Sequence, residues 1–324
     1  MKTLSKKFVS VLGALAILSL ASGTVLASEP PITIVVPYSP GGPTDIISRI
    51  VGKALGDELQ RSVIIDNRAG ASGIIGSSIV ARSKPDGTTL LVNSSIQEVL
   101  PSISSKMPYD TAKDFTPIGL LVNVPLVLAV TNSLPVKSVK ELRAYIAAHP
   151  DKVNVGNPGV GSSDQLAAGL FRMLTNLKTQ DISYKGSSPA ITDLIGGQIQ
   201  MMFDAGPSIM PFVKKGNLRG LATSGAIRSK AIPDLPTMEE AGVHGFDLVN
   251  WYGMWGPAGM DPKISHSLIE ALQKVMKLPA VEKQLNSLGA EPAHNLYGSA
   301  FKKFGEQERE KLGKIAKAAN IKLN

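Results

Sequence analysis

A proline- and glycine-rich segment lies between a short apolar run at residues 32–36 and an amphipathic stretch that begins near Asp45. It covers residues 37–45 and reads Pro-Tyr-Ser-Pro-Gly-Gly-Pro-Thr-Asp. Its prolines fix φ and lack an N–H donor, whereas Gly41 and Gly42 can adopt φ > 0 and expose bare backbone to a ligand. Because a helix is expected next, its free N–H groups and partial positive charge point back into the loop. The segment therefore predicts a binding site for an anion such as a carboxylate or a phosphate.

A second glycine-bearing segment, at residues 157–165, also follows a predicted strand and precedes a predicted helix. It reads Asn-Pro-Gly-Val-Gly-Ser-Ser-Asp-Gln. Neither segment has the Gly-x-Gly-x-x-Gly spacing of a dinucleotide site or the Gly-Lys-Ser/Thr of a P-loop, so nucleotide binding is disfavoured. Since ligands of open α/β sheets bind beyond the carboxyl ends of the strands, we expect the two loops to face one cleft.

Metal and nucleophile chemistry find little support in the sequence. The four histidines lie far apart without metal-ligand spacing and there is no cysteine, so we expect no metal site and no cofactor. No Gly-x-Ser-x-Gly nucleophile elbow occurs. A periplasmic serine hydrolase acting through Ser162 or Ser163 stays open as an alternative, because the sequence does not show whether a base lies beside them.

Several hydrogen-bonding side chains follow predicted strands. Serines in such places most often cap helices or form turns, but their shared position at strand ends makes ligand contact an equal alternative. Asp204 is expected either to cap the next helix or to bond to water in the cleft. The aromatic residues Trp251, Tyr252 and Trp255 are interpreted as core. The other candidates for ligand contact are Ser94, Ser95, Ser162, Ser163 and Tyr184.

The elements that must position these residues alternate between strand-like and helix-like stretches. Strands are predicted at residues 32–36, 62–66, 88–92, 125–130, 153–157, 181–184, 199–203 and 218–223, and helices between most of them and from about 261, 280 and 299 onward. One helix is predicted to open at Ser138, since Glu141 three residues on completes a capping box. Such βαβ units predict parallel sheets. Two α/β units joined by extended connectors are expected to enclose a ligand cleft.

The N-terminal residues 1–27 have the layout of a secretory signal peptide. Three lysines precede an apolar run that is shorter than the ~20 residues of a membrane-spanning helix, and cleavage is expected near Ala27. Without cysteine, neither a disulfide nor a lipid-modified N-terminal cysteine can form. We therefore expect a periplasmic protein that is not lipid-anchored.

The charge of the chain argues against a nucleic-acid partner. The formal net charge of +8 includes the three lysines of the predicted signal peptide, which leaves +5 for the rest. These basic residues are spread along the chain rather than gathered in a run, so a nucleic-acid surface is disfavoured.

Three segments carry a recognisable pattern. Residues 35–45 read Val-Val-Pro-Tyr-Ser-Pro-Gly-Gly-Pro-Thr-Asp, residues 66–76 read Asp-Asn-Arg-Ala-Gly-Ala-Ser-Gly-Ile-Ile-Gly, and residues 85–87 read Pro-Asp-Gly. Further matching segments follow in order at residues 109–117, 138–142, 184–190, 193–204, 233–242 and 251–253. This ordered series resembles the solute-binding receptors of the tripartite tricarboxylate transporter system, the Bug family, over essentially all of the mature chain.

The resemblance implies an α/β fold of the two-lobed periplasmic binding protein type (type II-like, Venus flytrap), in which each lobe is a mixed sheet flanked by helices and the ligand cleft lies between the lobes. Residues 28–130 with residues 250–324 would form lobe 1, and residues 131–249 lobe 2. Such a protein is a receptor and not an enzyme. It would capture a small carboxylate, of the di- or tricarboxylate, amino-acid or aromatic-acid type, and deliver it as a monomer to membrane permease subunits.

The resemblance also implies which residues bind the ligand. Tyr38, Gly41, Gly42, Thr44 and Asp45 would form one wall, Gly161, Ser162, Ser163 and Gln165 the other, and Ser94, Ser95, Tyr184 and Asp204 the hinge side. The second loop departs from the family, since Gln165 stands where many relatives have histidine and Asn157-Pro158 replaces a small Ser/Ala pair. A sensor partner of a membrane kinase with the same fold is a further alternative, and the sequence does not identify the carboxylate.

Overall fold

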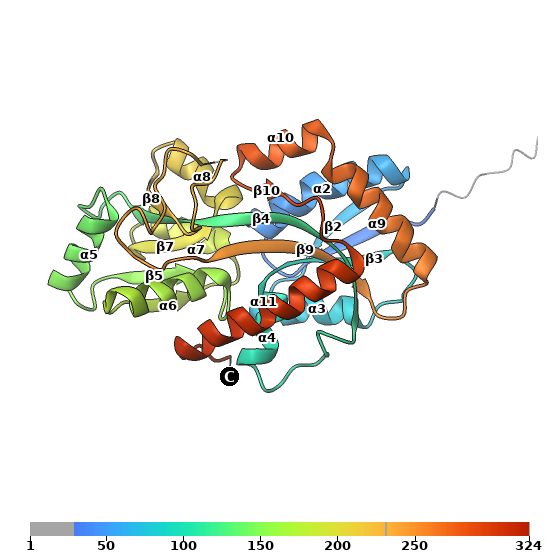
Figure 1. Ribbon diagram of the computed structural model, residues 1–324, viewed down its shortest axis with the longest axis horizontal. Coiled ribbons are helices and arrows are strands. Elements are labelled where there is room, and N and C mark those ends of the chain that lie inside the picture. Colours follow the sequence, from blue (N-terminus) through green and yellow to red (C-terminus); the bar gives the residue numbers. More distant parts are fainter. Residues whose placement is uncertain (1–28, 231, 324) are drawn as a thin grey trace, which may run out of the picture. The chain divides into compact units, whose positions relative to one another are not determined.

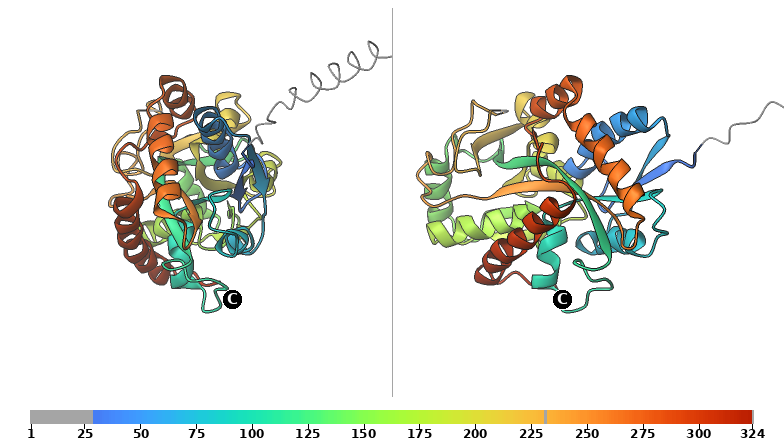
Figure 2. Two further views of the ribbon diagram at one scale, coloured as in Figure 1. Left: turned by 90° about the vertical axis from the view of Figure 1, so that its right-hand side faces the viewer. Right: turned by 45° about the vertical axis from the view of Figure 1, so that its right-hand side comes forward.

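Strands and helices alternate from Ile32 onward, as Figures 1 and 2 show for this computed structural model. The structure describes residues 29–230 and 232–323, so the predicted signal peptide at residues 1–27 lies outside the described residues. None of the helices in the described part combines the length and the apolar character that a membrane crossing requires.

The first three strands are parallel, as the βαβ pattern predicts. β1 (Ile32–Val36) lies between β2 (Val63–Asn67) and β3 (Thr89–Ser94). The connections contain α2 (Pro43–Leu59), the short 3₁₀ helix η1 (Ala71–Gly73) and α3 (Ile74–Ala81). The carboxyl ends of β1 and β3 therefore lie at the same edge of the sheet, where the loop before α2 and the residues after β3 come together.

Two long antiparallel strands extend this sheet. β9 (Val249–Pro257) pairs with β3, and β4 (Phe115–Thr131) pairs with β9. The expectation of parallel sheets is wrong here, because β9 returns from the far end of the chain instead of following a crossover helix. Only residues 125–130 of β4 were predicted, since the preceding stretch contains Pro117 and Gly119, and the register shifts twice along it.

β4 also begins the second group of strands. Its residues Leu126–Val130 pair with β7 (Met201–Ala205), and the same end of the strand pairs with β8 (Leu218–Thr223). β5 (Asn154–Asn157) is parallel to both β7 and β6 (Gln180–Ser183). Figure 1 shows β4 and β9 running side by side from the first group of strands toward the second. The change of partner occurs after Pro125, which has no N–H to donate to a ladder.

The helices of the second group are α5 (Val139–Ala148), α6 (Ser163–Thr175), α7 (Ser187–Ile195) and α8 (Gly206–Lys214). α5 begins as predicted, with the Ser138 side chain accepting a hydrogen bond from Glu141 N at 3.1 Å. The chain ends with α9 (Pro262–Met276), α10 (Pro279–Ser287), the short strand β10 (Glu291–Pro292), which pairs with β4, and α11 (Gly298–Ala318).

One helix was not predicted. α4 (Ile96–Ile103) contains Pro101 and follows the polar Ser95, which hid it from a periodicity argument. It packs against α11, where Arg309 Nε donates to Glu98 Oε2 at 2.9 Å. α11 also contacts α6, so the C-terminal helix touches elements of both strand groups.

The core is continuous between the two groups of strands. One buried cluster includes Ile34 of β1, Leu128 of β4 and Phe203 of β7. Trp251 and Trp255 are 1% and 4% exposed and pack with Phe301, which confirms their interpretation as core.

Candidate functional site

A small buried cavity lies where the two glycine loops meet. Its free volume is about 20 Å³, which is close to the space that one water molecule needs. The lining comes from the loop before α2 and the first turn of that helix, the end of β3, the loop before α6 and its first turn, the first turn of α7 and the first half of β9. The lining residues are Tyr38, Gly42, Pro43, Thr44, Ser94, Pro158, Ser162, Asp164, Ser187, Asn250 and Tyr252.

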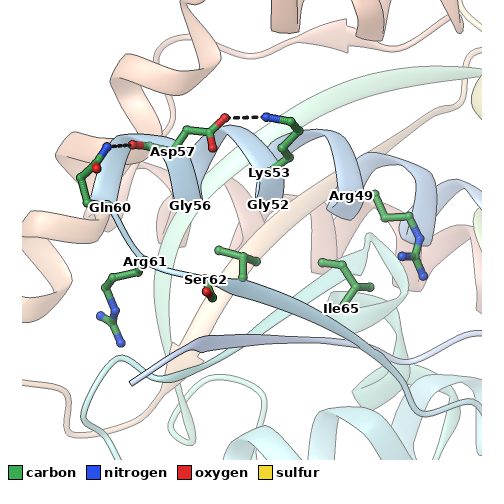
Figure 3. A pocket seen from close by; sticks show the side chains of 10 residues that line it. Arg49, Gly52, Lys53, Gly56, Asp57, Gln60, Arg61, Ser62 and Ile65 are labelled. Atoms are coloured by element: carbon green, nitrogen blue, oxygen red, sulfur yellow. Dashed lines mark hydrogen bonds and ion pairs between the residues drawn. The ribbon is translucent and has the colours of Figure 1, made fainter. Parts of the chain in front are cut away.

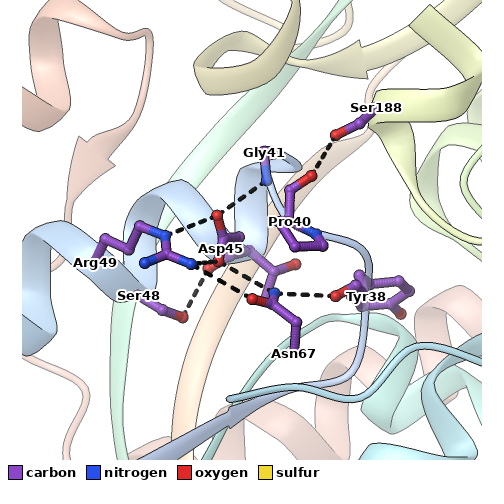
Figure 4. A network of polar contacts seen from close by, with 9 residues as sticks. Tyr38, Pro40, Gly41, Asp45, Ser48, Arg49, Asn67 and Ser188 are labelled. Carbon is purple, nitrogen blue, oxygen red and sulfur yellow. Dashed lines mark hydrogen bonds and ion pairs between the residues drawn. The ribbon is translucent and has the colours of Figure 1, made fainter. Parts of the chain in front are cut away.

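The first loop is held by Asp45 (Figure 4). Gly41 has φ +80° and its N–H donates to Asp45 Oδ2 at 2.9 Å. The same carboxylate accepts from Arg49 Nε at 2.9 Å and from Asn67 Nδ2 at 3.1 Å. Burial alone would raise the pKa of Asp45, but these three donors outweigh it and hold the pKa below its ordinary value. Asp45 therefore supports the loop as an anion and does not line the cavity.

The second loop is held by Gln165 in the same way. Gly161 has φ +82° and its N–H donates to Gln165 Oε1 at 2.8 Å. Gln165 Nε2 donates to Asp181 Oδ2 at 3.1 Å, and Asp181 is also bonded to Arg172 at 2.7 Å. Both ends of the glutamine side chain are therefore used within the protein, away from the cavity.

The two loops thus share one geometry. In each, a glycine with φ near +80° donates its N–H to a side chain four residues later, in the first turn of the following helix. Gly42 in the first loop then corresponds to Ser162 in the second, and Thr44 corresponds to Asp164; all four line the cavity. The sequence signal for this match is the pair of strings Gly-x-x-x-Asp and Gly-x-x-x-Gln, each before a helix.

Two helix N-termini without side-chain caps face the cavity. α2 follows Gly42 with Pro43 as its first residue, and α7 follows Gly186, whose φ is +133°. A Cβ on Gly42 would lie 3.9 Å from Ser187 N, so the two helix starts are close together. Gly42 itself has φ −77°, so the expected φ > 0 is found at Gly41 and is wrong for Gly42. Free N–H groups at both helix starts make this corner attractive to an anion.

A pair of carboxyl groups stands beside these helix starts. Asp164 is 4% exposed and Asp204 is fully buried. Ser187 Oγ donates to Asp204 Oδ1 at 2.7 Å, and Ser208 Oγ also donates to Asp204. Burial raises the pKa of both groups, and the charge of Asp204 raises that of Asp164 further. The hydroxyls of Ser187 and Ser208 stabilise the Asp204 anion, whereas Asp204 disfavours the anion of Asp164, so a proton shared by the pair favours Asp164.

Asp204 does not cap α8, contrary to one of its two expected roles. The cap residue of α8 is Ala205, which makes no side-chain hydrogen bond. The Asp204 carboxylate instead accepts hydrogen bonds from Ser187 and Ser208. It lies behind the cavity-lining Ser187 instead of lining the cavity itself.

β9 contributes two residues that the sequence argument missed. Successive residues of a strand point to opposite faces, so Asn250 and Tyr252 line the cavity while Trp251 packs with Phe301. Asn250 Nδ2 donates to Tyr252 Oη at 3.0 Å. Interpreting Tyr252 only as core was therefore incomplete, since it is buried and yet faces the cavity. Burial raises the pKa of Tyr252, so its hydroxyl stays neutral.

Five of the thirteen predicted ligand-binding residues line the cavity: Tyr38, Gly42, Thr44, Ser94 and Ser162. The others form a supporting layer or lie elsewhere. Ser95 Oγ donates to Asn250 Oδ1 at 2.9 Å and so orients a lining residue. Ser163 is buried next to Asp164, and Tyr184 lies apart from the cavity with its hydroxyl donating to Asp193 at 2.7 Å. The lining residues that the sequence argument missed are Pro43, Pro158, Asp164, Ser187, Asn250 and Tyr252.

In the described part of the chain, Ser162 is a helix cap and has no histidine base in the cavity. Ser162 Oγ accepts a hydrogen bond from Gln165 N at 3.2 Å and caps α6. No histidine is among the lining residues of the cavity, and three of the four histidines pair with glutamates on the surface. Within the described part of the chain, no group of three or more His, Asp or Glu side chains is placed to hold a metal ion.

A wider groove of about 620 Å³ lies between α2 and β2 (Figure 3). It exists because Gly52 and Gly56 bring the helix close to the strand; a Cβ on Gly56 would lie 2.7 Å from Arg61 O. Its rim carries the exposed pair of Lys53 and Asp57, 2.7 Å apart. The groove is open to solvent and results from the close packing of the helix on the strand. The cavity between the glycine loops is therefore the better candidate site.

Comparison with known proteins gives a consistent picture. Residues 47–321 match the family model described as "Tripartite tricarboxylate transporter family receptor". The chain is 36% identical over 264 residues to Protein BugT of Bordetella pertussis, covering 81% of each chain. Two solved structures are also similar. The periplasmic binding protein BugD is 31% identical with a TM-score of 0.87, and the match covers 91% of this chain and 99% of BugD. The structure described as R. palustris Rpa4515 with adipate is 33% identical with a TM-score of 0.88, and the match covers 91% of this chain and 98% of that one.

Proposed function

Because this chain belongs to the tripartite tricarboxylate transporter receptor family, we propose that it captures a small carboxylate in the cavity between its glycine loops and delivers it to a membrane permease. The family consists of solute-binding receptors rather than enzymes, and it shares the α/β fold of periplasmic binding proteins. The adipate named with the similar Rpa4515 supports a carboxylate as the ligand class.

The observation that carries the proposal is the meeting of two uncapped helix N-termini at a cavity lined by hydroxyl groups. Their N–H groups can bind a carboxylate without an arginine or lysine, and neither residue type is among the eleven that line the cavity. Neutral donors hold an anion less tightly than a paired cation does, which suits a receptor that must release its cargo.

We also propose that the ligand enters when two lobes separate, with lobe 1 formed by residues 28–130 and 250–324 and lobe 2 by residues 131–249. A cavity of about 20 Å³ is too small for a carboxylic acid of several carbons. The loops that close it touch directly, since Ser188 Oγ donates to Pro40 O at 2.8 Å and Ser39 Oγ donates to Lys185 O at 3.2 Å. A hinge at the lobe boundaries, at the end of β4 and the start of β9, would separate these contacts.

Export of the receptor through a signal peptide at residues 1–27, its action as an unanchored periplasmic monomer and its hand-over to permease subunits complete this proposal. Cross-linking in membranes followed by identification of the captured proteins tests the last step. Recovery of the large and small permease subunits is expected, whereas recovery of a membrane kinase alone would favour the sensor alternative.

The test of binding is a thermal-shift screen of aliphatic and aromatic mono- and dicarboxylates on protein that has been unfolded, stripped of ligand and refolded. Isothermal titration then measures the dissociation constant of each compound that raises the unfolding temperature. At least one carboxylate should bind with a stoichiometry of one. If the refolded protein is folded by circular dichroism and no carboxylate binds, the proposal is wrong.

A further inference from the structure

Among the eleven residues that line the cavity, Asp164 is the only one with an acidic or basic side chain of the Asp, Glu, Lys, Arg or His type. It occupies the same position in its loop as Thr44 does in the other loop, two residues after the helix cap. The two walls of the site are therefore alike in backbone geometry and unlike in chemistry. One wall offers a neutral hydroxyl, and the other offers a carboxyl group.

The surroundings of Asp164 are acidic and hydroxylic. The groups that face it are Asp204 on β7, the hydroxyls of Tyr38 and Tyr252, and the neighbouring Ser163. The arginines of the two helices that follow the loops are paired with other carboxylates, Arg49 of α2 with Asp45 and Arg172 of α6 with Asp181. A second carboxylate of a bound ligand would therefore meet the acidic pair with no arginine or lysine among the described residues that line the cavity, in a site shielded from water.

We infer that Asp164 determines the ligand class by accepting a hydrogen bond from an ammonium group, so that the ligand is a zwitterionic amino acid and not a simple dicarboxylate. This inference rests on the proposed function and narrows it. The carboxylate of the ligand lies at the starts of α2 and α7, and its ammonium group lies against Asp164. The two charged groups of the ligand thus meet different partners, the N–H groups of the helix starts and the carboxyl group of Asp164.

This binding mode predicts whether protons are released when a ligand binds. Burial and the neighbouring Asp204 raise the pKa of Asp164, which favours its protonated form in the free protein. An ammonium group favours the Asp164 anion, so binding of an amino acid releases that proton to the buffer. A dianion favours the protonated acid, so its binding releases no proton.

The experiment compares matched probes on the purified, ligand-stripped protein. Each pair differs in one group, as in 4-aminobutanoate with glutarate, L-glutamate with glutarate, and L-aspartate with succinate. Isothermal titration at neutral pH in buffers of different ionisation enthalpy gives both the affinity and the number of protons released. We expect the tightest probe to be an amino acid, with proton release on binding.

Asp164→Asn should weaken amino-acid binding by about tenfold or more and leave dicarboxylate binding unchanged or improved, since it removes the charged acceptor and keeps the shape. The matched control is Asp193→Asn, which removes one carboxylate outside the cavity and keeps an acceptor for Tyr184; its binding should equal that of the wild type.

The inference would be overturned, with the proposed function intact, by a dicarboxylate that binds more tightly than its amino-acid partner in every pair, or by amino-acid binding without proton release. Equal amino-acid affinity in wild type and Asp164→Asn would do the same. Because proton release is measured on the wild type, the inference can be tested even if the Asp164→Asn variant folds poorly. Failure of the whole carboxylate screen would instead reject the proposed function.

Discussion

Replacing Asp45 by asparagine tests whether this carboxylate holds the first glycine loop as an anion. Its oxygens accept from Gly41 N, Arg49 Nε and Asn67 Nδ2 at 2.9, 2.9 and 3.1 Å, while its side chain is 4% exposed. An amide has one acceptor oxygen, so its NH₂ group must face one of these donors. Hydrogen bonds to charged groups contribute about 1.5–3 kcal/mol each, and the half-exposed Arg49 adds about 0–1 kcal/mol. We therefore expect Asp45→Asn to lower the free energy of unfolding by about 2–3 kcal/mol at neutral pH.

The pH dependence of this loss follows from the lowered pKa of Asp45. A carboxyl group whose pKa is lower in the folded state stabilises the fold above its unfolded pKa of about 3.9 and loses that contribution as the pH falls through the folded pKa. The difference between wild type and Asp45→Asn should thus be largest near neutral pH and shrink below about pH 4. Urea unfolding of both proteins over this pH range measures it.

Asp57→Asn is the matched control, because Asp57 lies in the same helix and pairs with Lys53 at the same four-residue spacing. Its side chain is 70% exposed and that of Lys53 is 79% exposed, so the loss should stay within about 0.5 kcal/mol. The reasoning would be refuted if Asp45→Asn cost no more than this control, or if its cost did not change with pH.

Three other substitutions probe the cavity and its closure. Gly42→Val should weaken carboxylate binding by about tenfold in isothermal titration, since the methyl groups of valine would enter the cavity. The unfolding temperature should change little, because a φ of −77° suits valine; a large fall in that temperature would show that the loop has a structural role. Gly161→Ala should lower the free energy of unfolding by about 2–3 kcal/mol, because the new Cβ would lie 2.1 Å from Ile103 Cδ1 at φ +82°; a neutral result in urea unfolding would contradict this. Ser188→Ala removes the bond to Pro40 O and should weaken binding by about threefold, with unfolding unaffected; unchanged affinity would show that this contact does not favour the closed state.

The parts of the fold that could be predicted are those in which local pattern and tertiary environment agree. β1, β8 and the start of α5 match their predictions because an apolar run or a capping Ser138 is decisive by itself. The first ten residues of β4 and the whole of α4 could not be predicted. Prolines in both segments argue against regular structure locally, and only pairing with β9 and packing on α11 stabilise them.

The sequence by itself determined that two glycine loops precede two helices, that no cysteine, nucleotide motif or metal-ligand spacing is present, and that an anion is the natural ligand. Those properties depend on residue type and on spacing over a few residues. The tertiary structure decided which side chains face the cavity. In it, Asp45 and Gln165 hold the glycine loops by hydrogen bonds, and the buried Tyr252 faces the cavity. Asp164 lies beside Asp204, which is forty residues away along the chain. Strand facing, helix entry angles and the pKa of a buried pair depend on contacts between distant segments, so no local pattern could have given them.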